Sequence, residues 1–365
     1  MAASINLRKL KVFPLAQRDS LARLEDILVE PDSKPAPCPG WKLADIRRCA
    51  RHIAEARKRG AGVMLIYGAH LIKNGAALIV LRLLEGDWIT HLATNGAGAI
   101  HDWEFAFAGV STEDVRANVA AGTFGAWAET GRNIHLALLA GGAAGEGFGS
   151  ALGRFISQDG ARLPSEKTLE AALRKAPGHA LAAARAELLR AMREHGLAAG
   201  RHEVAHRWKE TSVLARCFKM KVPLTVHPGI GYDIIANHPM FNGAAIGRAA
   251  GVDFGIFGGA VEALDGGVAL SIGSAIMGPQ VFEKSLSCVN NLRLQAGRPV
   301  VRGHHIYVVD LQDGGGWDWK GGEPPKDNPA YYLRFCKSYS RMGGAMTYVQ
   351  IDNVAFLHHL LRELS

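Results

Sequence analysis

Tyr67-Gly68-Ala69-His70-Leu71-Ile72-Lys73-Asn74-Gly75 is a glycine- and amide-containing turn that directly follows the apolar run 63–67. A second turn of this kind, Ala93-Thr94-Asn95-Gly96-Ala97-Gly98-Ala99-Ile100-His101-Asp102, follows the run 88–92. Loops at the carboxyl ends of parallel strands are where open α/β sheets bind nucleotides and small substrates. Glycine allows close approach of a ligand to the backbone, and the next helix offers free N–H groups to an anion.

The same unit of strand, glycine loop and helix recurs along the chain. Strands are expected at 62–67 and 88–93, and a helix at 70–85 would join them as a parallel βαβ unit. Further strands are expected at 222–227, 267–272, 306–311 and 346–351, with a terminal helix at 353–363. This recurrence predicts an α/β fold with a doubly wound, mainly parallel, Rossmann-like sheet.

The remaining segments suggest an arm and an insertion around one domain. Residues 1–42 have little periodicity, and we expect an N-terminal arm there with one short helix near residues 20–29. Residues 43–365 would form a single α/β domain, which begins with a helix over 43–59. The stretch 166–218 is rich in Ala, Leu and Arg and is expected to be a helical insertion.

Composition narrows the class of protein. The 365 residues are 48% hydrophobic and 21% charged, which is typical of a globular chain with a full core. The net charge of +8 is spread over helices, so solvated helix faces explain it better than an acidic partner, and we expect no nucleic-acid binding. Five widely spaced cysteines and no long apolar run indicate a reduced, cytoplasmic protein without membrane contact.

Several well-known motifs are missing. No G-x-G-x-x-G follows the first strand, and the similar stretch 145–149 has no strand before it. A P-loop lysine motif and Gly-x-Ser-x-Gly are also absent. None of the 15 histidines shows metal-ligand spacing, so we expect no metal site.

Two residues carry chemistry of their own. Asp102 at a helix start could accept hydrogen bonds from a ribose, or it could help to cap that helix. Lys337 lies among Tyr331, Tyr332, Phe335 and Tyr339. Desolvation there would favour the free amine that a Schiff-base nucleophile needs. In the alternative, the lysine stem packs on the rings while the ammonium reaches water.

The order of these segments resembles the deoxyhypusine synthase family from about residue 43 to the end of the chain. The first loop, 68–75, is similar to the family's Thr-Ser-Asn-Leu-Ile-Ser-Ser-Gly, and 94–98 is similar to its Thr-Thr-Ala-Gly-Gly. His101-Asp102 falls where the family has two glutamates, and Phe335-Cys336-Lys337 where it has Trp-Gly-Lys. The loops at 228–233, 272–274 and 313–316 resemble three further loops of the family.

The resemblance implies an NAD site in a homo-oligomer, a dimer or tetramer, and transfer of an amine through an imine on Lys337. His101 and Asp233 would join Lys337 as catalytic residues. The residues implied to bind NAD are Gly68, His70, Asn74, Thr94, Asn95, Gly96, Gly98, Asp102, Gly231, Gly273, Ser274 and Asp313.

The chain also departs from the family pattern. The family's adjacent histidines fall at Gly278-Pro279, and its Asp-Ser-Gly loop becomes Gly-Gly-Trp317-Asp318-Trp319. The loops that would hold a dinucleotide match the family's pattern more closely than the loops that would hold a polyamine. We therefore expect an NAD-dependent transferase that acts on a small amine other than the family's substrate. The alternatives are a catalytically silent nucleotide-binding or assembly protein of this fold, or another NAD-using enzyme.

Overall fold

The computed structural model describes residues 4–365, apart from the side chain of Lys320, and divides them into two compact units. Unit 1 comprises the residues up to Asp26 together with Ala99–Lys221 and Pro228–Asp253. Unit 2 comprises Ile27–Gly98, Val222–His227 and Phe254–Ser365. The predicted insertion, 166–218, lies within unit 1.

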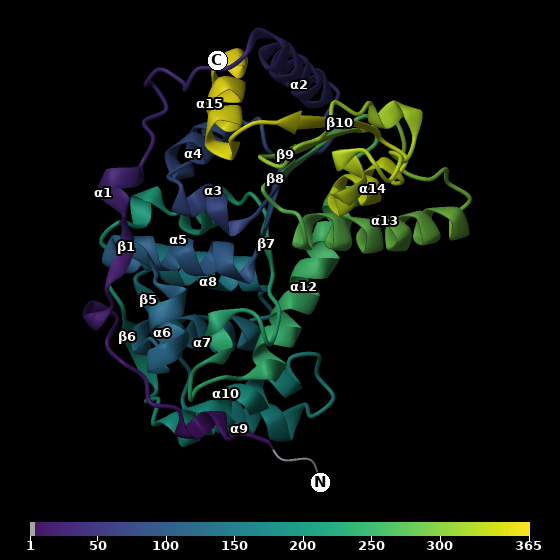
Figure 1. Ribbon diagram of the computed structural model, residues 1–365. Helices are drawn as coiled ribbons and strands as arrows, with labels where there is room; N and C mark the ends of the chain where they lie inside the picture. Colours follow the sequence, from purple (N-terminus) through teal and green to yellow (C-terminus); the bar gives the residue numbers. More distant parts are fainter. Residues whose placement is uncertain (1–3) are drawn as a thin grey trace. The chain divides into compact units, whose positions relative to one another are not determined.

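Unit 2 is built on a six-stranded sheet in which every pairing is parallel, and its strand order is β10-β9-β8-β2-β3-β7 (Figure 1). Its strands are β2 (Val63–Tyr67), β3 (His91–Asn95), β7 (Leu224–His227), β8 (Val268–Ile272), β9 (His305–Asp310) and β10 (Ala345–Gln350). Its helices include α2 (Gly40–Lys58), α3 (Ala69–Lys73), α4 (Ala77–Glu85), α13 (Met277–Gln295), α14 (Arg334–Ser340) and α15 (Asn353–Leu364). The shorter η5 (Trp319–Gly321) and η6 (Pro329–Tyr332) also belong to it.

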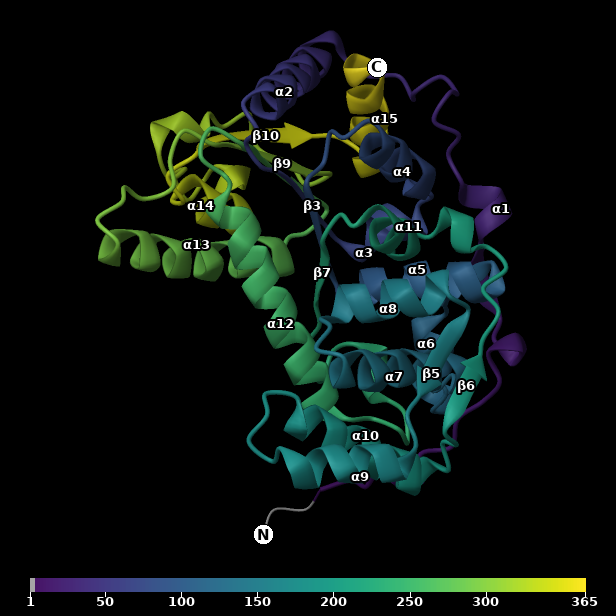
Figure 2. The ribbon, with the colours of Figure 1, turned by 180° about the vertical axis from the view of Figure 1, so that it is seen from behind.

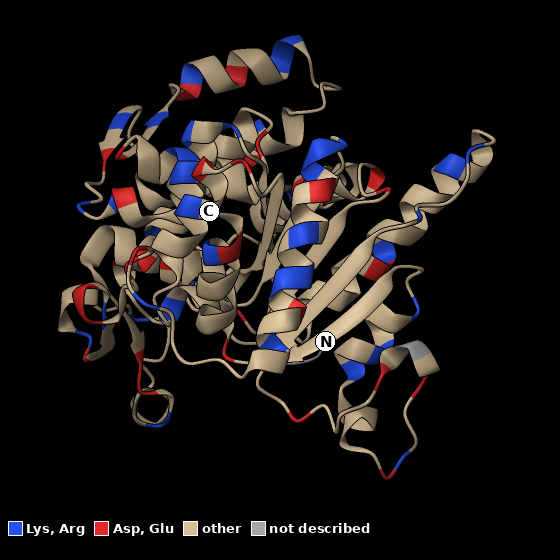
Figure 3. Cartoon of the chain, turned by 90° about the horizontal axis from the view of Figure 1, so that it is seen from above, with Lys and Arg blue, Asp and Glu red and all other residues tan. Residues whose placement is uncertain are grey.

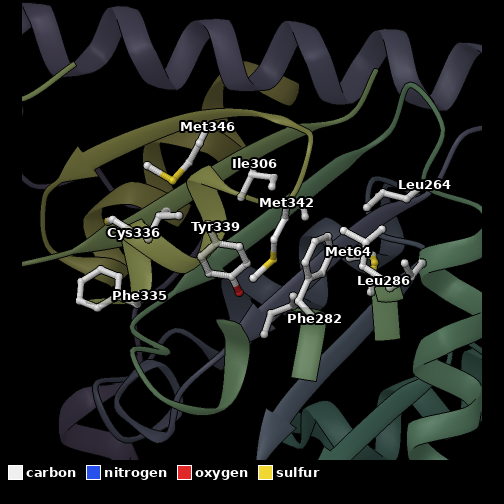
Figure 4. Close-up of a cluster of buried hydrophobic side chains, with 14 of the residues drawn as sticks. Met64, Leu264, Phe282, Leu286, Ile306, Phe335, Cys336, Tyr339, Met342 and Met346 are labelled. Carbon is white, nitrogen blue, oxygen red and sulfur yellow. The ribbon is translucent and has the colours of Figure 1, made fainter. Parts of the chain in front are cut away.

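Both faces of this sheet are covered by helices. Met64 and Ile66 of β2 point into a core formed with α13, α14 and the end of α12 (Gly243–Glu262) (Figure 4). Their neighbours Val63, Leu65 and Tyr67 are equally buried, and because side chains alternate along a strand they face the other side. Helices α2, α4 and α15 pack there. Burial of both faces explains the continuous apolar runs and confirms the doubly wound α/β fold.

Unit 1 is mainly helical. Its larger helices α8 (Phe148–Ser157), α7 (Ala128–Ala143), α10 (Ala182–His195) and α9 (Glu166–Lys175) pack in that order, each against the next (Figure 2). Two antiparallel strand pairs accompany them, β1 (Ser20–Arg23) with β4 (Val110–Glu113) and β5 (Gly160–Leu163) with β6 (Gly200–Glu203). The remaining elements are η1 (Leu7–Lys9), η2 (Leu15–Gln17), α1 (Leu24–Ile27), α5 (Gly96–Ala108), α6 (Val115–Ala121), η3 (Lys209–Thr211), α11 (Val213–Met220) and η4 (Ile234–Ala236).

Four local predictions need correction. Residues 20–23 form strand β1, because they pair with β4, and only residues 24–27 are helical. The expected helix 70–85 is interrupted after Lys73, since Gly75 has a φ of +88°. The strand expected at 88–93 runs from His91 to Asn95. The stretch 166–218 contains strand β6 as well as helices, because 200–203 pair with β5.

Helix α12 is relevant to the prediction of no membrane contact, and the distribution of charged residues is relevant to the prediction of no nucleic-acid binding. Among the described residues α12 alone is long and apolar enough to span a membrane, by length and composition only, and 33% of its most apolar window is buried. Lys and Arg are interspersed with Asp and Glu along the chain (Figure 3). This mixture is typical of solvated helix faces.

Candidate functional site

The candidate site lies at the carboxyl edge of the sheet in unit 2. Because all six strands are parallel, the loops that follow β2, β3 and β8 leave the same edge. If these six strands are numbered 1 to 6 along the chain, so that β2 is 1 and β8 is 4, their order across the sheet from β7 to β10 is 3-2-1-4-5-6. This is the strand order of dinucleotide-binding folds, and the direction of winding reverses between β2 and β8. The residues next to that switch point are Gly68 and Gly273.

Gly68 and Gly273 bring two loops into direct contact. The Gly68 N–H donates to the carbonyl oxygen of Ile272 at 3.1 Å, and a Cβ on Gly68 would overlap the carbonyl oxygen of Gly273. Gly273 has a φ of +57°, and a Cβ there would overlap the side-chain amide of Asn353. The first glycine of each loop is therefore required by the protein's own packing.

Polar groups gather around the loop that follows β8. Ser274 Oγ accepts a 2.9 Å hydrogen bond from the Gly278 N–H. A Cβ built on Gly278 would lie 2.9 Å from both Ser274 Oγ and Tyr339 Oη, so these hydroxyls share one side of that residue. Burial raises the pKa of Tyr339, whose ring packs beside Phe282 and Met342 (Figure 4). This tyrosine is therefore a neutral hydrogen-bonding group.

Asn353 supplies the test of whether a ligand fits. Its side chain is 8% exposed, and among the described residues its Oδ1 accepts no hydrogen bond. A buried acceptor without a donor is unfavourable by about 1–3 kcal/mol, so a donor from a bound water or ligand would stabilise it. Asn353, Ser274 and the buried Tyr339 hydroxyl thus place three polar groups next to the switch point.

The loop after β3 holds four of the predicted residues, and its contacts are internal. Thr94 Oγ1 donates to the Tyr67 carbonyl oxygen at 3.1 Å and so joins β3 to β2. Asn95 Oδ1 accepts a 2.8 Å hydrogen bond from the Gly98 N–H and caps α5, whose first residue is Gly96. A Cβ on Gly98 would overlap Thr94 Oγ1. These side chains shape the edge of the sheet.

Three other predicted residues are exposed to solvent in unit 2. His70 lies on α3, where burial and Lys73 lower its pKa and Asp310 at the end of β9 raises it. Asn74 ends α3, and Asp313 Oδ1 accepts a hydrogen bond from the Gly315 N–H. His70 is thus an exposed imidazole at this edge, and the charge of Asp310 acts on it.

Lys337 lies on α14 beside a cavity of about 390 Å³. Its Nζ is 3.7 Å from the centre of the Tyr331 ring and forms an ion pair with Glu323. Hydrogen bonds from Lys337 and Arg341 lower the pKa of the exposed Glu323 carboxyl. The ammonium itself thus contacts an aromatic face and a carboxylate, whereas the alternative expected the stem on the rings and the ammonium in water.

His101 and Asp102 belong to unit 1, where both are engaged in its interior. Asp102 is 2% exposed and accepts hydrogen bonds from Ser212 Oγ (2.6 Å) and the Val213 and Leu214 N–H groups (2.9 and 3.1 Å). It therefore caps α11, and burial raises its pKa to about 6. The prediction that Asp102 stands at a helix start is wrong, because it lies within α5, and the helix that it caps is α11 and not its own.

His101 Nδ1 lies 2.7 Å from Ser111 Oγ, which donates to Glu104 at 2.5 Å. Glu104 also forms a fully buried, bidentate pair with Arg18 at 2.8 and 2.9 Å. His101 is thus attached to a buried network that ties the N-terminal segment to α5.

Asp233 and Gly231 form a tight turn in unit 1. Asp233 is 5% exposed, and its Oδ2 accepts a 2.7 Å hydrogen bond from the Gly229 N–H. Gly231 has a φ of +104°, a conformation that favours glycine.

The structure therefore brings together, at one edge of unit 2, Gly68, Gly273, Ser274 and the loop 94–98, while His101, Asp102, Gly231 and Asp233 serve unit 1. Sequence reasoning missed Asn353, although its position directly after the last strand was visible. Within the described residues no group of three or more His, Cys, Asp or Glu side chains could hold a metal ion.

No protein-family model matches the chain, and no curated protein matches it by sequence. Among solved structures it is similar to ArgZ, an arginine dihydrolase from the ornithine-ammonia cycle in cyanobacteria, at 14% identity and a TM-score of 0.40. It is similar to AgrE in ternary complex with ornithine and NAD⁺ at 14% identity and a TM-score of 0.43. A putative LOR/SDH protein from Methanococcus maripaludis S2 is 15% identical, with a TM-score of 0.41.

The chain spans about a third of the length of ArgZ and AgrE and about three quarters of the third protein. The alignments cover 88%, 90% and 97% of this chain, and 32%, 34% and 76% of the three neighbours respectively. Similarity of this degree says nothing about reaction or substrate.

Proposed function

We propose that unit 2 binds a pyridine dinucleotide, NAD, at the switch point between β2 and β8, and that the protein is an NAD-dependent enzyme acting on a small amine. The strand order is the observation that carries this proposal, because the crevice at such a reversal is the usual dinucleotide site. When bound, NAD would supply hydride acceptance, and the protein would orient it.

In this proposal Asn353 and Ser274 would hold the nucleotide, and the loop 94–98 would shape the crevice floor. The missing G-x-G-x-x-G fingerprint is consistent with this assignment, because Gly68 packs on Gly273 and leaves recognition to side chains. His70 is the group at this edge that could exchange a proton with solvent, since it is exposed.

The resemblance gives Lys337 the role of imine-forming residue. For this role the amine must first lose a proton, and Glu323 is the carboxylate in contact with it. Oligomer formation, which the resemblance also implies, is part of the same proposal.

A second candidate function is a catalytically silent nucleotide-binding or assembly protein. The ion pair of Lys337 with Glu323 favours it, because a charged ammonium is not a nucleophile. Reduction with borohydride in the presence of NAD and candidate amines, followed by mass spectrometry, separates the two. Because the amine must be oxidised before its carbon can bond to Lys337, only the transferase would acquire a mass adduct on Lys337, and only when NAD is present.

Calorimetric titration with NAD tests the binding step. NAD at a hundred times its Kd is expected to stabilise the folded protein by about 2.7 kcal/mol. Asn353→Ala should weaken NAD binding about tenfold, because one hydrogen bond to the buried amide is lost. Asn291→Ala, on the exposed part of α13, is the matched control. Absence of binding by NAD and NADP, or equal affinities in both variants, would contradict the proposed site.

A further inference from the structure

The cavity beside Lys337 is lined by one face of a helix. In α14 and just after it, Arg334, Lys337, Ser338 and Arg341 stand at positions i, i+3, i+4 and i+7, and all four line the cavity. Residues with this spacing lie on one side of a helix. The opposite side, with Phe335, Cys336 and Tyr339, is buried in the core (Figure 4).

The cavity carries excess positive charge. Glu323 pairs with Lys337 and, at 2.6 Å, with Arg341, so a single carboxylate is shared between two cations. Arg334 is exposed and forms no ion pair with any residue of the described chain. Three cations therefore face one carboxylate, and the cavity retains two positive charges. A polyamine would meet repulsion there, whereas an anion would be attracted.

Aromatic rings form the rest of the wall. Tyr331 lies under the Lys337 ammonium, and Tyr332 meets Tyr331 edge to face with ring centres 5.4 Å apart. Tyr332 is 72% exposed, which leaves its ring open to a ligand. Arginine guanidinium groups bind carboxylates and phosphates through two parallel hydrogen bonds, and a tyrosine ring contacts the remainder of such a molecule.

We propose that this cavity is an oxyanion site that binds a small molecule bearing a carboxylate or phosphate group. Arg334 and Arg341 supply the paired donors, Lys337 supplies a point charge, and Tyr332 contacts the apolar part of the ligand. Binding of an oxyanion is inferred from the cavity alone, and only the identification of that oxyanion as the enzyme's substrate rests on the proposed function. A substrate that is both an amine and an acid would meet both requirements.

The test is calorimetric titration at constant ionic strength, without NAD, using inorganic phosphate, malonate, benzoate and spermidine as probes. At least one anion is expected to bind in the millimolar range or tighter, and spermidine is expected not to bind. Arg334→Gln should weaken anion binding about tenfold, since one charge-assisted pair is lost. Arg302→Gln is the control, because it removes the same charge from an exposed arginine elsewhere in unit 2.

Equal anion affinity in Arg334→Gln and the wild type, or tighter binding of spermidine than of every anion, would overturn the proposal. Competition of NAD with malonate would assign the oxyanion to the cofactor's own phosphates, and independent binding would assign it to a separate substrate. Anion binding that persists in a protein with no affinity for NAD would contradict the dinucleotide proposal and leave this one standing.

Discussion

Lowering the pH from 7 to 5 is expected to destabilise unit 2 by about 4 kcal/mol through two buried histidines. His91 Nε2 and His227 Nε2 each lie 3.1 Å from the same hydroxyl oxygen, Thr225 Oγ1. Both rings contact the edge or face of Phe257, with centres 5.5 and 5.2 Å from it. Burial lowers the pKa of His91 from 6.5 to about 3 and that of His227 to about 4.

The direction and the size of this loss of stability follow from the number of protons that the folded and the unfolded chain bind. Both folded pKa values are below the unfolded value of 6.5, so between pH 6.5 and about 4 the unfolded chain binds more protons. Stability is therefore retained above pH 6.5 and falls with acidification, by about 1.4 kcal/mol per pH unit for each histidine. Over the 1.5 units from 6.5 to 5, each contributes about 2 kcal/mol.

Urea unfolding followed by circular dichroism at pH 7, 6 and 5 measures this loss. His91→Gln, which cannot be protonated, should reduce the pH slope by about one proton, while His179→Gln, which removes an exposed imidazole of unit 1, should not change it. Buried histidines of unit 1 add to the wild-type slope, so the difference between the variants is the decisive quantity. A His91→Gln slope equal to that of the wild type would refute the reasoning.

Three further substitutions test the packing described above. Gly68→Ala should lower the free energy of unfolding by about 3 kcal/mol or more, because its Cβ would overlap the backbone of Gly273; thermal or urea unfolding measures this. The control is Gly247→Ala on α12, whose Cβ would meet no atom within 4 Å and which should be neutral or slightly stabilising. Asn95→Ala should cost about 1 kcal/mol through loss of the α5 cap, and an unchanged melting temperature would contradict that role. Glu104→Gln should cost about 3–5 kcal/mol, since it leaves the Arg18 charge buried without its partner; a smaller cost in Arg18→Met/Glu104→Met than in the single variant would confirm this reason.

The sheet of unit 2 could be predicted from sequence because its signals are local. Apolar runs identified β2, β7, β8, β9 and β10 to within two residues. A strand buried on both faces has a composition that few other structures share. The glycines at the ends of β2 and β8 were predicted to bind a cofactor, and in the structure Gly68 packs against Gly273 and Gly273 against Asn353.

The roles of the polar residues could not be predicted in the same way, because they depend on contacts between distant segments. Asp102 caps a helix that begins 111 residues later, and Arg18 pairs with Glu104 across 86 residues. Strands β1, β5 and β6 are only four residues long, and β1 pairs with β4 across about 90 residues. The helix face formed by Arg334, Lys337, Ser338 and Arg341 was also missed, because α14 is only seven residues long.

The placement of β8 beside β2 has a consequence for how this protein folds while it is being synthesised. Val63 pairs with Val268, so the middle of the sheet joins residues that emerge about 200 positions apart. Closure of such a distant pairing is slow, and until it happens the side of β2 that awaits β8 is an unpaired edge. Nascent chains that end before β8 should therefore be prone to aggregation and should depend on chaperones, whereas chains that extend past β9 should not.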